Sequence, residues 1–195
     1  MFTGIVEERG AVRSFGNGRL VVGCRVVAVD SPIGASVAVN GVCLTVVERT
    51  GDSLAFDLSA ETIERTSLAR LRNGHPVNLE RPVTLAARLG GHLVQGHADG
   101  IGRVAAVEPD GTGGAWLRLR VPDDLLRYVV EKGSITVDGV SLTVAERHAD
   151  GVTIALIPHT LAATTLGSAG PEDPVNLEID VIARYVERLM EGESR

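Results

Sequence analysis

The chain has 195 residues, which is long for one small domain and suits two domains of about 90 to 100 residues each. Its net charge is −6 and it has no long basic run, so binding to nucleic acid or to an anionic membrane surface is not expected. The N-terminus "MFTGIVEERG" lacks a signal-peptide pattern, and no apolar run approaches the roughly 18 residues of a membrane span. The two cysteines, Cys24 and Cys43, are interpreted as free thiols, and we expect a soluble cytoplasmic protein.

Much of the first half of the sequence is repeated in the second half. Windows that begin at Gly34 and Lys132 share seven identities, and "PVNLE" occurs unchanged in both halves. One shift of 98 residues relates three pairs of blocks: 34–46 with 132–144, 58–68 with 156–166, and 76–80 with 174–178. The front of the repeat, "FTGIVEERGAV" over "VQGHADGIGRV", is shifted by 92 residues instead. We therefore predict two similar domains from a duplication, residues 1–90 and 91–180.

Short runs that alternate between apolar and polar residues predict strands in each half. In the first half these runs are "RLVVGCRVV" (19–27), "SVAV" (36–39), "VCLTVV" (42–47), "LAFDLS" (54–59) and "PVNLE" (76–80). Segments 61–71 and 159–166 are predicted to be short helices between strands. About six short strands in about 90 residues favour a small closed barrel over a sandwich. The predicted fold class is all-β, with two tandem six-stranded Greek-key barrels.

The sequence period changes at the C-terminus, where residues 181–195 are predicted to form one amphipathic helix with Asp180 as its N-cap. One side carries an apolar stripe, Ile182, Tyr185, Val186 and Leu189, and the other carries Arg184, Glu187 and Arg188. Such a stripe packs either on its own barrel or on copies of the same helix. The residues alone leave both arrangements open.

The strings "VNGVCLTV" and "VDGVSLTV" predict two-residue hairpins, because Asn-Gly and Asp-Gly tolerate positive φ at both turn positions. In this register one face of the first hairpin is apolar core: Val37, Val39, Val42, Leu44 and Val46. The opposite faces carry small side chains: Ser36, Ala38, Cys43 and Thr45 in the first copy, and Ser134, Thr136, Ser141 and Thr143 in the second. Such a face is either an ordinary solvated side or a surface for a ligand rich in amide-like groups.

The histidines give a weaker signal. His75 and His148 lie in turn sequences and are expected to be exposed, and His159 lies in a repeated block. His92 and His97 are five residues apart without a third ligand at matching spacing, so no metal site is expected. The glycines around His97 permit close approach of the backbone to a ligand, although a structural histidine fits equally well. The sequence has no P-loop, dinucleotide-binding glycine motif or serine-hydrolase elbow.

Five motifs together resemble riboflavin synthase of the alpha-chain type, over essentially the whole chain: "MFTGIVEE", "VNGVCLTV", "GGHLVQGHADG", "KGSITVDGVSLTV" and "LIPHTL". The resemblance implies two barrels and a C-terminal helix through which three chains form a homotrimer. It implies a transferase of riboflavin biosynthesis that binds two molecules of 6,7-dimethyl-8-ribityllumazine per active site. One molecule donates a four-carbon unit to the other, which gives riboflavin and 5-amino-6-ribitylaminouracil. No metal or organic cofactor is implied, and the site is expected between the first barrel of one chain and the second barrel of its neighbour.

The resemblance also implies site residues. Those assigned to the first barrel are Gly4, Ile5, Val6, Cys43, Leu44, Thr45, Asp57, Leu58, Ser59, Ala60, Glu61 and Thr62, with Phe2 as a cap. Those assigned to the second barrel are Gly96, His97, Ala98, Ser141, Leu142, Thr143, Leu156, Ile157, Pro158, His159, Thr160 and Leu161, with Lys132 reaching across. His97 is expected to take the proton of the acidic 7-methyl group, and Ser141 and Thr143 to position a water or stabilise the carbanion. Cys43 and Ser36 are expected to serve the facing ring, Cys43 as nucleophile or proton donor.

Two other functions are compatible with a duplicated barrel. Lumazine proteins share the fold but only bind a lumazine or flavin as an optical antenna. Such proteins are expected to lose residues of the second barrel, whereas Lys132, His97, Ser141 and Thr143 are all present here, which favours the enzyme. A flavin-binding barrel of a reductase is expected to precede a nucleotide-binding domain, for which this chain leaves no room.

Overall fold

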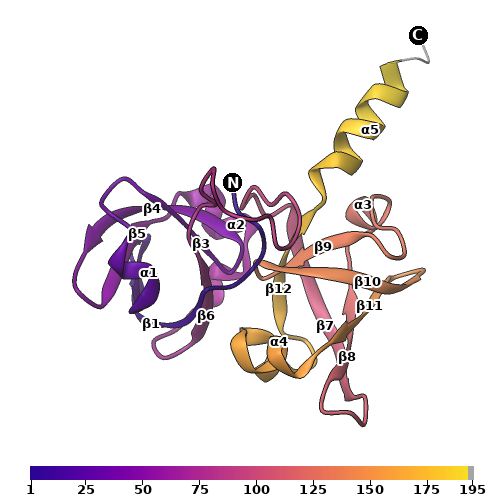
Figure 1. Ribbon diagram of the computed structural model, residues 1–195, viewed down its shortest axis with the longest axis horizontal. Helices are drawn as coiled ribbons and strands as arrows, with labels where there is room; N and C mark the ends of the chain where they lie inside the picture. The colour runs from indigo at the N-terminus through magenta and orange to yellow at the C-terminus, as the bar shows by residue number, and fades with distance from the viewer. Residues whose placement is uncertain (193–195) are drawn as a thin grey trace.

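The computed structural model describes residues 1–192, which form two closed antiparallel barrels and a helix that projects from the second barrel (Figure 1). The first barrel consists of β1 (Glu8–Gly16), β2 (Arg19–Gly23), β3 (Ser36–Val39), β4 (Val42–Arg49), β5 (Ser53–Asp57) and β6 (Pro76–Glu80). The second consists of β7 (Gly100–Pro109), β8 (Ala115–Arg120), β9 (Ser134–Val137), β10 (Val140–His148), β11 (Gly151–Leu156) and β12 (Pro174–Ile179). The barrels close in equivalent orders, β1-β2-β5-β4-β3-β6 and β7-β8-β11-β10-β9-β12. The predicted fold class is confirmed.

The two hairpins have the predicted register. Val39 pairs with Val42 and Ser36 pairs with Thr45, and β9 pairs with β10 in the same way. The four turn residues have φ values of +45 to +78, the left-handed conformation that Asn-Gly and Asp-Gly adopt at low cost. The valine and leucine face of the first hairpin is buried in a core of its own barrel, and the second barrel encloses a separate core.

Reciprocal side-chain bonds hold the barrels against each other. Asn78 on β6 donates from Nδ2 to the backbone oxygen of Asp138 over 2.9 Å, and its counterpart Asn176 on β12 donates to the backbone oxygen of Asn40 over 2.9 Å. The side chains of Asn40 and Asp138 in turn accept the backbone N–H groups of Asn78 and Asn176. Burial raises the pKa of Asp138 to about 7. The repeated "VNG/VDG" and "PVNLE" blocks thus form the contact between the barrels.

Both predicted crossing helices are present, each in two pieces. The first barrel has α2 (Ala60–Arg65) followed by the 3-10 turn η1 (Ser67–Arg70), and the second has α4 (Pro158–Ala163) followed by η2 (Thr165–Ser168). Thr66 donates from Oγ1 to the Thr62 oxygen over 2.6 Å and accepts the backbone N–H of Leu68 over 3.4 Å. Thr164 makes the same two bonds in the second barrel. The same threonine side chain therefore joins the two helical pieces in each barrel.

The alternation of residues 19–27 predicts a strand over the whole run, but only its first part is a strand in the structure. Strand β2 ends at Gly23, and α1 (Val26–Val29) follows. The carboxylate of Glu8 accepts the backbone N–H groups of Arg25, Val26 and Val27 over 2.6, 2.9 and 2.9 Å. A carboxylate that satisfies the free N–H groups of a first turn stabilises a helix start. The short helix α3 (Asp123–Leu126) lies at the corresponding place in the second barrel.

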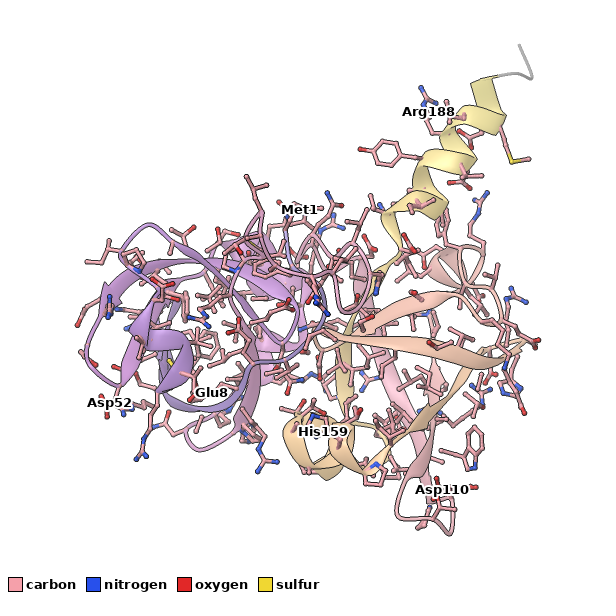
Figure 2. All side chains as sticks on the ribbon, in the orientation of Figure 1. Met1, Glu8, Asp52, Asp110, His159 and Arg188 are labelled. Atoms are coloured by element: carbon pink, nitrogen blue, oxygen red, sulfur yellow. The ribbon has the colours of Figure 1, made fainter. Side chains whose placement is uncertain are left out.

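Helix α5 (Val181–Gly192) begins at the predicted cap, where Asp180 accepts the backbone N–H of Ile182 over 3.0 Å. Its polar side faces the second barrel, since Arg184 pairs with Asp99 over 2.6 Å and Glu187 pairs with Arg127. The apolar stripe is exposed, with fractions of 55 % for Ile182, 67 % for Tyr185, 49 % for Val186 and 72 % for Leu189. Packing of this stripe on its own barrel is therefore excluded, and the helix stands away from the body with Arg188 near its end (Figure 2).

Of the predicted helix 181–195, residues 193–195 lie outside the described part of the chain. Within residues 1–192, no helix combines the length and the apolar character that crossing a membrane requires.

Candidate functional site

The segments that precede the two barrels are exchanged between them. Residues 4–6 lie against the hairpin of the second barrel, where the Ser141 backbone N–H donates to the Gly4 oxygen over 2.7 Å. Residues 96–98 lie against the hairpin of the first barrel, where the Cys43 N–H donates to the Gly96 oxygen over 2.8 Å. Each hairpin face is therefore completed by the segment that leads into the other barrel.

Packing agrees with these hydrogen bonds. Val6 packs against the core of the second barrel, and Ala98 packs against the core of the first. The expected grouping, in which each leading segment joined its own barrel, is wrong. The structure brings Gly4, Ile5 and Val6 to Ser141, Leu142 and Thr143, and it brings Gly96, His97 and Ala98 to Cys43, Leu44 and Thr45.

Two glycines allow this close approach. Gly4 and Gly96 have φ values of +76 and +79, and a Cβ on them would lie 2.6 Å from Ser141 Cβ and 2.8 Å from Cys43 Cβ. Neither the backbone conformation nor the space admits a side chain. Phe2 is fully buried beside this crossing, where its N–H bonds to the Val94 oxygen over 2.7 Å. Phe2 thus anchors the segment that contains Gly4 to the segment that contains Gly96, and its expected role as a cap on the site stays a prediction.

Two buried glutamates hold the exchanged segments in place, at residues 3–4 and 95–97. Glu80 accepts the backbone N–H groups of Thr3 and Gly4 over 2.6 and 3.0 Å. Glu178 accepts those of Gln95, Gly96 and His97 over 2.6, 2.9 and 3.1 Å. Burial raises the pKa of both carboxyls, that of Glu178 to about 7, against the N–H donors that favour the charged form. Both glutamates belong to the repeated "PVNLE", whose sequence alone indicates no role for them.

On the first barrel, Ser36, Cys43 and Thr45 share one face of the hairpin and are partly or fully accessible. The segment 57–62 continues from β5, which pairs with β4, into α2. Ser59 caps that helix by accepting the Thr62 N–H over 3.1 Å. Two carboxylates of this segment form exposed ion pairs, Asp57 with Arg19 and Glu61 with Arg65, and Leu58 is buried in the core.

On the second barrel, Ser141 and Leu142 are half-buried and Thr143 is exposed. The segment 156–161 follows β11, with Leu156 buried and Ile157, Pro158 and His159 exposed at the start of α4 (Figure 2). Lys132 is exposed and has φ +65, at the place that Gly34 holds in the first barrel with φ +89. A lysine in this left-handed conformation is strained, which is common at functional positions.

His92, which is not among the expected site residues, contacts the second hairpin. Its Nδ1 lies 2.7 Å from Ser141 Oγ and its Nε2 lies 3.2 Å from Thr136 Oγ1. Burial lowers the pKa of His92, and the charge of Asp180 acts weakly in the opposite direction. His92 precedes the repeated region, so it has no counterpart in the first half that could have drawn notice.

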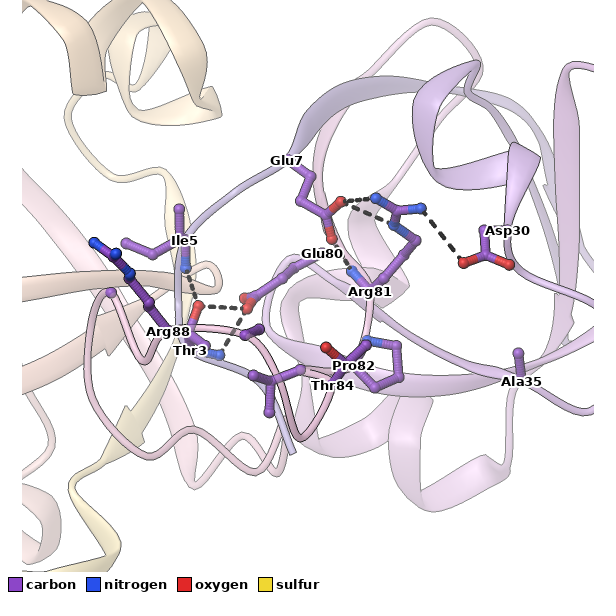
Figure 3. A pocket seen from close by; sticks show the side chains of 13 residues that line it. Thr3, Ile5, Glu7, Asp30, Ala35, Glu80, Arg81, Pro82, Thr84 and Arg88 are labelled. Carbon is purple, nitrogen blue, oxygen red and sulfur yellow. Dashed lines mark hydrogen bonds and ion pairs between the residues drawn. The ribbon is translucent and has the colours of Figure 1, made fainter.

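A cavity of about 600 Å³ opens beside Ile5, between the N-terminal segment and residues 81–90 (Figure 3). Arg81 pairs with Glu7 over 2.5 Å on one wall, and Glu80 receives the Thr3 hydroxyl over 2.8 Å on another (Figure 3). Of the expected site residues, only Ile5 lines this cavity. Within the described residues, no group of three or more His, Cys, Asp or Glu side chains could hold a metal ion.

Comparisons with known proteins agree with this arrangement. The family described as lumazine binding domain matches residues 3–82 and 95–180. Riboflavin synthase of Mycobacterium tuberculosis (strain ATCC 25618 / H37Rv) is 50 % identical over 200 residues, which cover 97 % of this chain and 98 % of the relative. The riboflavin synthases of Actinobacillus pleuropneumoniae and Bacillus subtilis (strain 168) are 41 % and 40 % identical, each over 97 % of this chain and 90 % of the relative.

Solved structures of LumP have the same fold. LumP complexed with riboflavin superposes with a TM-score of 0.86 at 26 % identity, over 92 % of this chain and 99 % of LumP. LumP complexed with 6,7-dimethyl-8-(1'-D-ribityl) lumazine gives 0.80 at 26 % identity, over 91 % and 98 %. The lumazine-binding family matches both halves of the chain, and the riboflavin synthases match it over 97 % of its length. The chain therefore belongs to the riboflavin synthase family.

Proposed function

We propose that this protein is a cytoplasmic transferase that dismutates two molecules of 6,7-dimethyl-8-ribityllumazine. One molecule gives up a four-carbon unit to the other, and the products are riboflavin and 5-amino-6-ribitylaminouracil. The observation that carries the proposal is the matched pair of hairpin faces, each completed by a glycine-containing segment exchanged from the other barrel. A reaction between two identical molecules needs two similar sites, and a duplicated barrel supplies them.

Each half of the chain would hold one heterocycle. The first would lie against residues 43–45, 57–62 and 96–98, and the second against residues 4–6, 141–143 and 156–161. Lys132 would reach across to the facing molecule. Holding two rings in a reactive geometry removes a translational and rotational cost that is on the order of 7–11 kcal/mol at best. Much of the rate enhancement would therefore come from binding both molecules at once.

His97, Cys43 and Ser36 all lie on the first-barrel site. Cys43 and Ser36 would contact the molecule held there, and His97 would accept the proton of the 7-methyl group of the facing molecule. Ser141 and Thr143 would contact the second molecule from the second barrel. The exposed apolar stripe of α5 supports a homotrimer held by three such helices. In that trimer the first barrel of one chain would face the second barrel of the next.

The test is to mix the purified protein with 6,7-dimethyl-8-ribityllumazine alone and to follow the absorbance of riboflavin. We expect riboflavin to form at half the molar rate of substrate loss, with nothing else added. The LumP complexes give the second candidate, a protein that binds lumazine or riboflavin without turnover. Tight binding of the lumazine with no riboflavin formed would identify that function and exclude the transferase.

A further inference from the structure

The two hairpin faces have different buried neighbours. In the first barrel, Cys43 packs against an apolar group made of Phe2, Ala38 and Val94. In the second barrel, the residues equivalent to Ala38 and Cys43 are Thr136 and Ser141, and both contact the buried His92. Within residues 1–192, the Cys43 side chain has no hydrogen-bond partner, whereas the Ser141 side chain has one. An apolar group therefore lies behind the first-barrel site, and a polar group lies behind the second-barrel site.

The direction of the polar contacts follows from the burial of Thr136. Its side chain is 1 % exposed, and within the described residues its Oγ1 has a single partner, His92 Nε2 at 3.2 Å. If Nε2 carried the ring hydrogen, the Thr136 hydroxyl hydrogen would be buried without an acceptor, which is costly. Thr136 therefore donates to Nε2, and the hydrogen of the imidazole lies on Nδ1. The ring is neutral in this arrangement, in agreement with the lowered pKa of His92.

An imidazole with its hydrogen on Nδ1 donates to Ser141 Oγ over 2.7 Å. Among residues 1–192, the Ser141 hydroxyl hydrogen then has no acceptor, and it is free to point away from His92 toward the ligand. We propose that Thr136 and His92 fix Ser141 as a hydrogen-bond donor to an acceptor atom, a carbonyl oxygen or an unprotonated ring nitrogen, of the heterocycle held by the second barrel. His92 is a positioning residue in this role, and the ligand rests on the proposed function above.

This direction has a chemical consequence. His92 cannot take the proton of Ser141, because its Nδ1 already carries one, so Ser141 is not activated as a nucleophile. A donor hydrogen bond strengthens when its acceptor gains negative charge. When the 7-methyl C–H bond breaks, the electron pair stays on the ring and the proton passes to His97 of the facing site. The second barrel is therefore the half that holds the deprotonated molecule.

The direct test is the protonation state of His92, measured by NMR of the ring nitrogens in ¹⁵N-labelled protein. The His92 signals are identified by their loss in His92→Gln, and the spectrum is taken with and without riboflavin bound. We expect hydrogen on Nδ1 and a bare Nε2. Hydrogen on Nε2 would overturn the proposal. This result does not depend on turnover, so it is separate from any failure of the proposed function.

Two variants of Ser141 extend the test to the reaction. A thiol is a weak hydrogen-bond donor but a strong nucleophile, so Ser141→Cys should lose as much activity as Ser141→Ala, about 10-fold to 100-fold in kcat. A Ser141→Cys variant that stays near wild-type activity while Ser141→Ala does not would show that Ser141 is a nucleophile and would refute its role as donor.

Thr136→Val removes the donor to Nε2 while keeping the shape of the side chain, and it should lower kcat about 10-fold with a smaller change in KM. Thr153→Val is the matched control. Its hydroxyl bonds to His148 Nε2 over 2.8 Å in the same barrel, away from the candidate site, and its loss should leave kcat unchanged. Equal activity of the two variants would contradict the proposal.

Discussion

The first and second barrels share their strand order, their hairpin register and the glutamate that holds the exchanged segment. They differ in side chains at or near the candidate sites: Gly34 and Lys132, Asn40 and Asp138, Cys43 and Ser141, and Glu61 and His159. The backbone of the repeat is kept because it builds two matching surfaces. The side chains have diverged, because two identical surfaces could not give different roles to two identical molecules.

The largest expected effect comes from mixing two variants, each of which has lost the site of one barrel (a half-site). His97→Gln disables the first-barrel site and Ser141→Ala the second-barrel site, and loss of the proton acceptor should cost about 10²-fold to 10⁴-fold in rate. In a cyclic trimer with sites between neighbouring chains, an equal mixture of the two variants leaves about a quarter of the sites intact. Refolding the two variants together should therefore restore riboflavin formation well above that of either variant alone.

The matched control for this mixture is His97→Gln with Cys43→Ala. His97 and Cys43 lie on the same half-site, since residues 96–98 pack against the first hairpin. No arrangement of these two variants gives an intact first-barrel site, so their mixture should stay as inactive as its components. Recovery of activity in this control, or none in the first mixture, would contradict sites shared between chains.

The next effect is a difference in pH dependence between the barrels. Burial raises the pKa of Asp138 to about 7 from an ordinary value of 3.8, whereas the equivalent Asn40 does not titrate. A raised pKa means that the protonated form stabilises the fold. This contribution is complete below about pH 4 and is lost as the pH rises through about 7. Asp138→Asn should remove the loss, and above pH 7 the variant should be more stable than wild type by on the order of 4 kcal/mol.

Urea unfolding at fixed protein concentration across pH 4 to 8 measures this difference. Glu178, with a pKa of about 7, adds to the wild-type loss over the same range, so the variant should keep part of the pH dependence. Asn40→Asp should impose a similar loss on the first barrel. Parallel curves for wild type and Asp138→Asn would show that the buried carboxyl does not titrate in this range.

The hairpins could be predicted in full from the sequence, because Asn-Gly and Asp-Gly determine both the turn and the register. The exchange of the leading segments could not, because order along the chain does not say which barrel a segment covers. The helix α1 was missed for a related reason. Its stabilising carboxylate, Glu8, lies on β1, far from the helix in the sequence.

The C-terminal helix shows another limit. Its stripe was visible in the sequence, but the choice between packing on the barrel and exposure depends on Asp99 and Arg127, which attract the polar side of the helix. His92 shows a limit of using the internal repeat to find site residues. A residue without a counterpart gains no support from the repeat, even where the structure bonds it to Ser141.

A smaller effect is expected for the glycines at the crossing. Gly4→Ala and Gly96→Ala each place a Cβ under 3.0 Å from a neighbour at positive φ, and each should destabilise the fold by about 2–3 kcal/mol. The losses should be similar in the two halves because the backbone is the same. Gly74→Ala, with φ +87 and no atom within 4 Å of the added Cβ, is the control for φ alone and should cost about 1 kcal/mol. Equal losses in all three variants by urea unfolding would show that the close contacts do not matter.

The smallest expected effect tests the equality of the two backbones most closely. Thr66 and Thr164 are buried at the same place in each repeat, and each bonds to the carbonyl oxygen four residues earlier, over 2.6 and 2.7 Å, and to the N–H of a following leucine. Thr66→Val and Thr164→Val remove the same bonds in each half, so each should lower the free energy of unfolding by about 1 kcal/mol. A loss in only one of the two variants would show that this threonine contributes unequally to the free energy of unfolding in the two barrels. The divergence between the barrels would then extend beyond the side chains that face the sites.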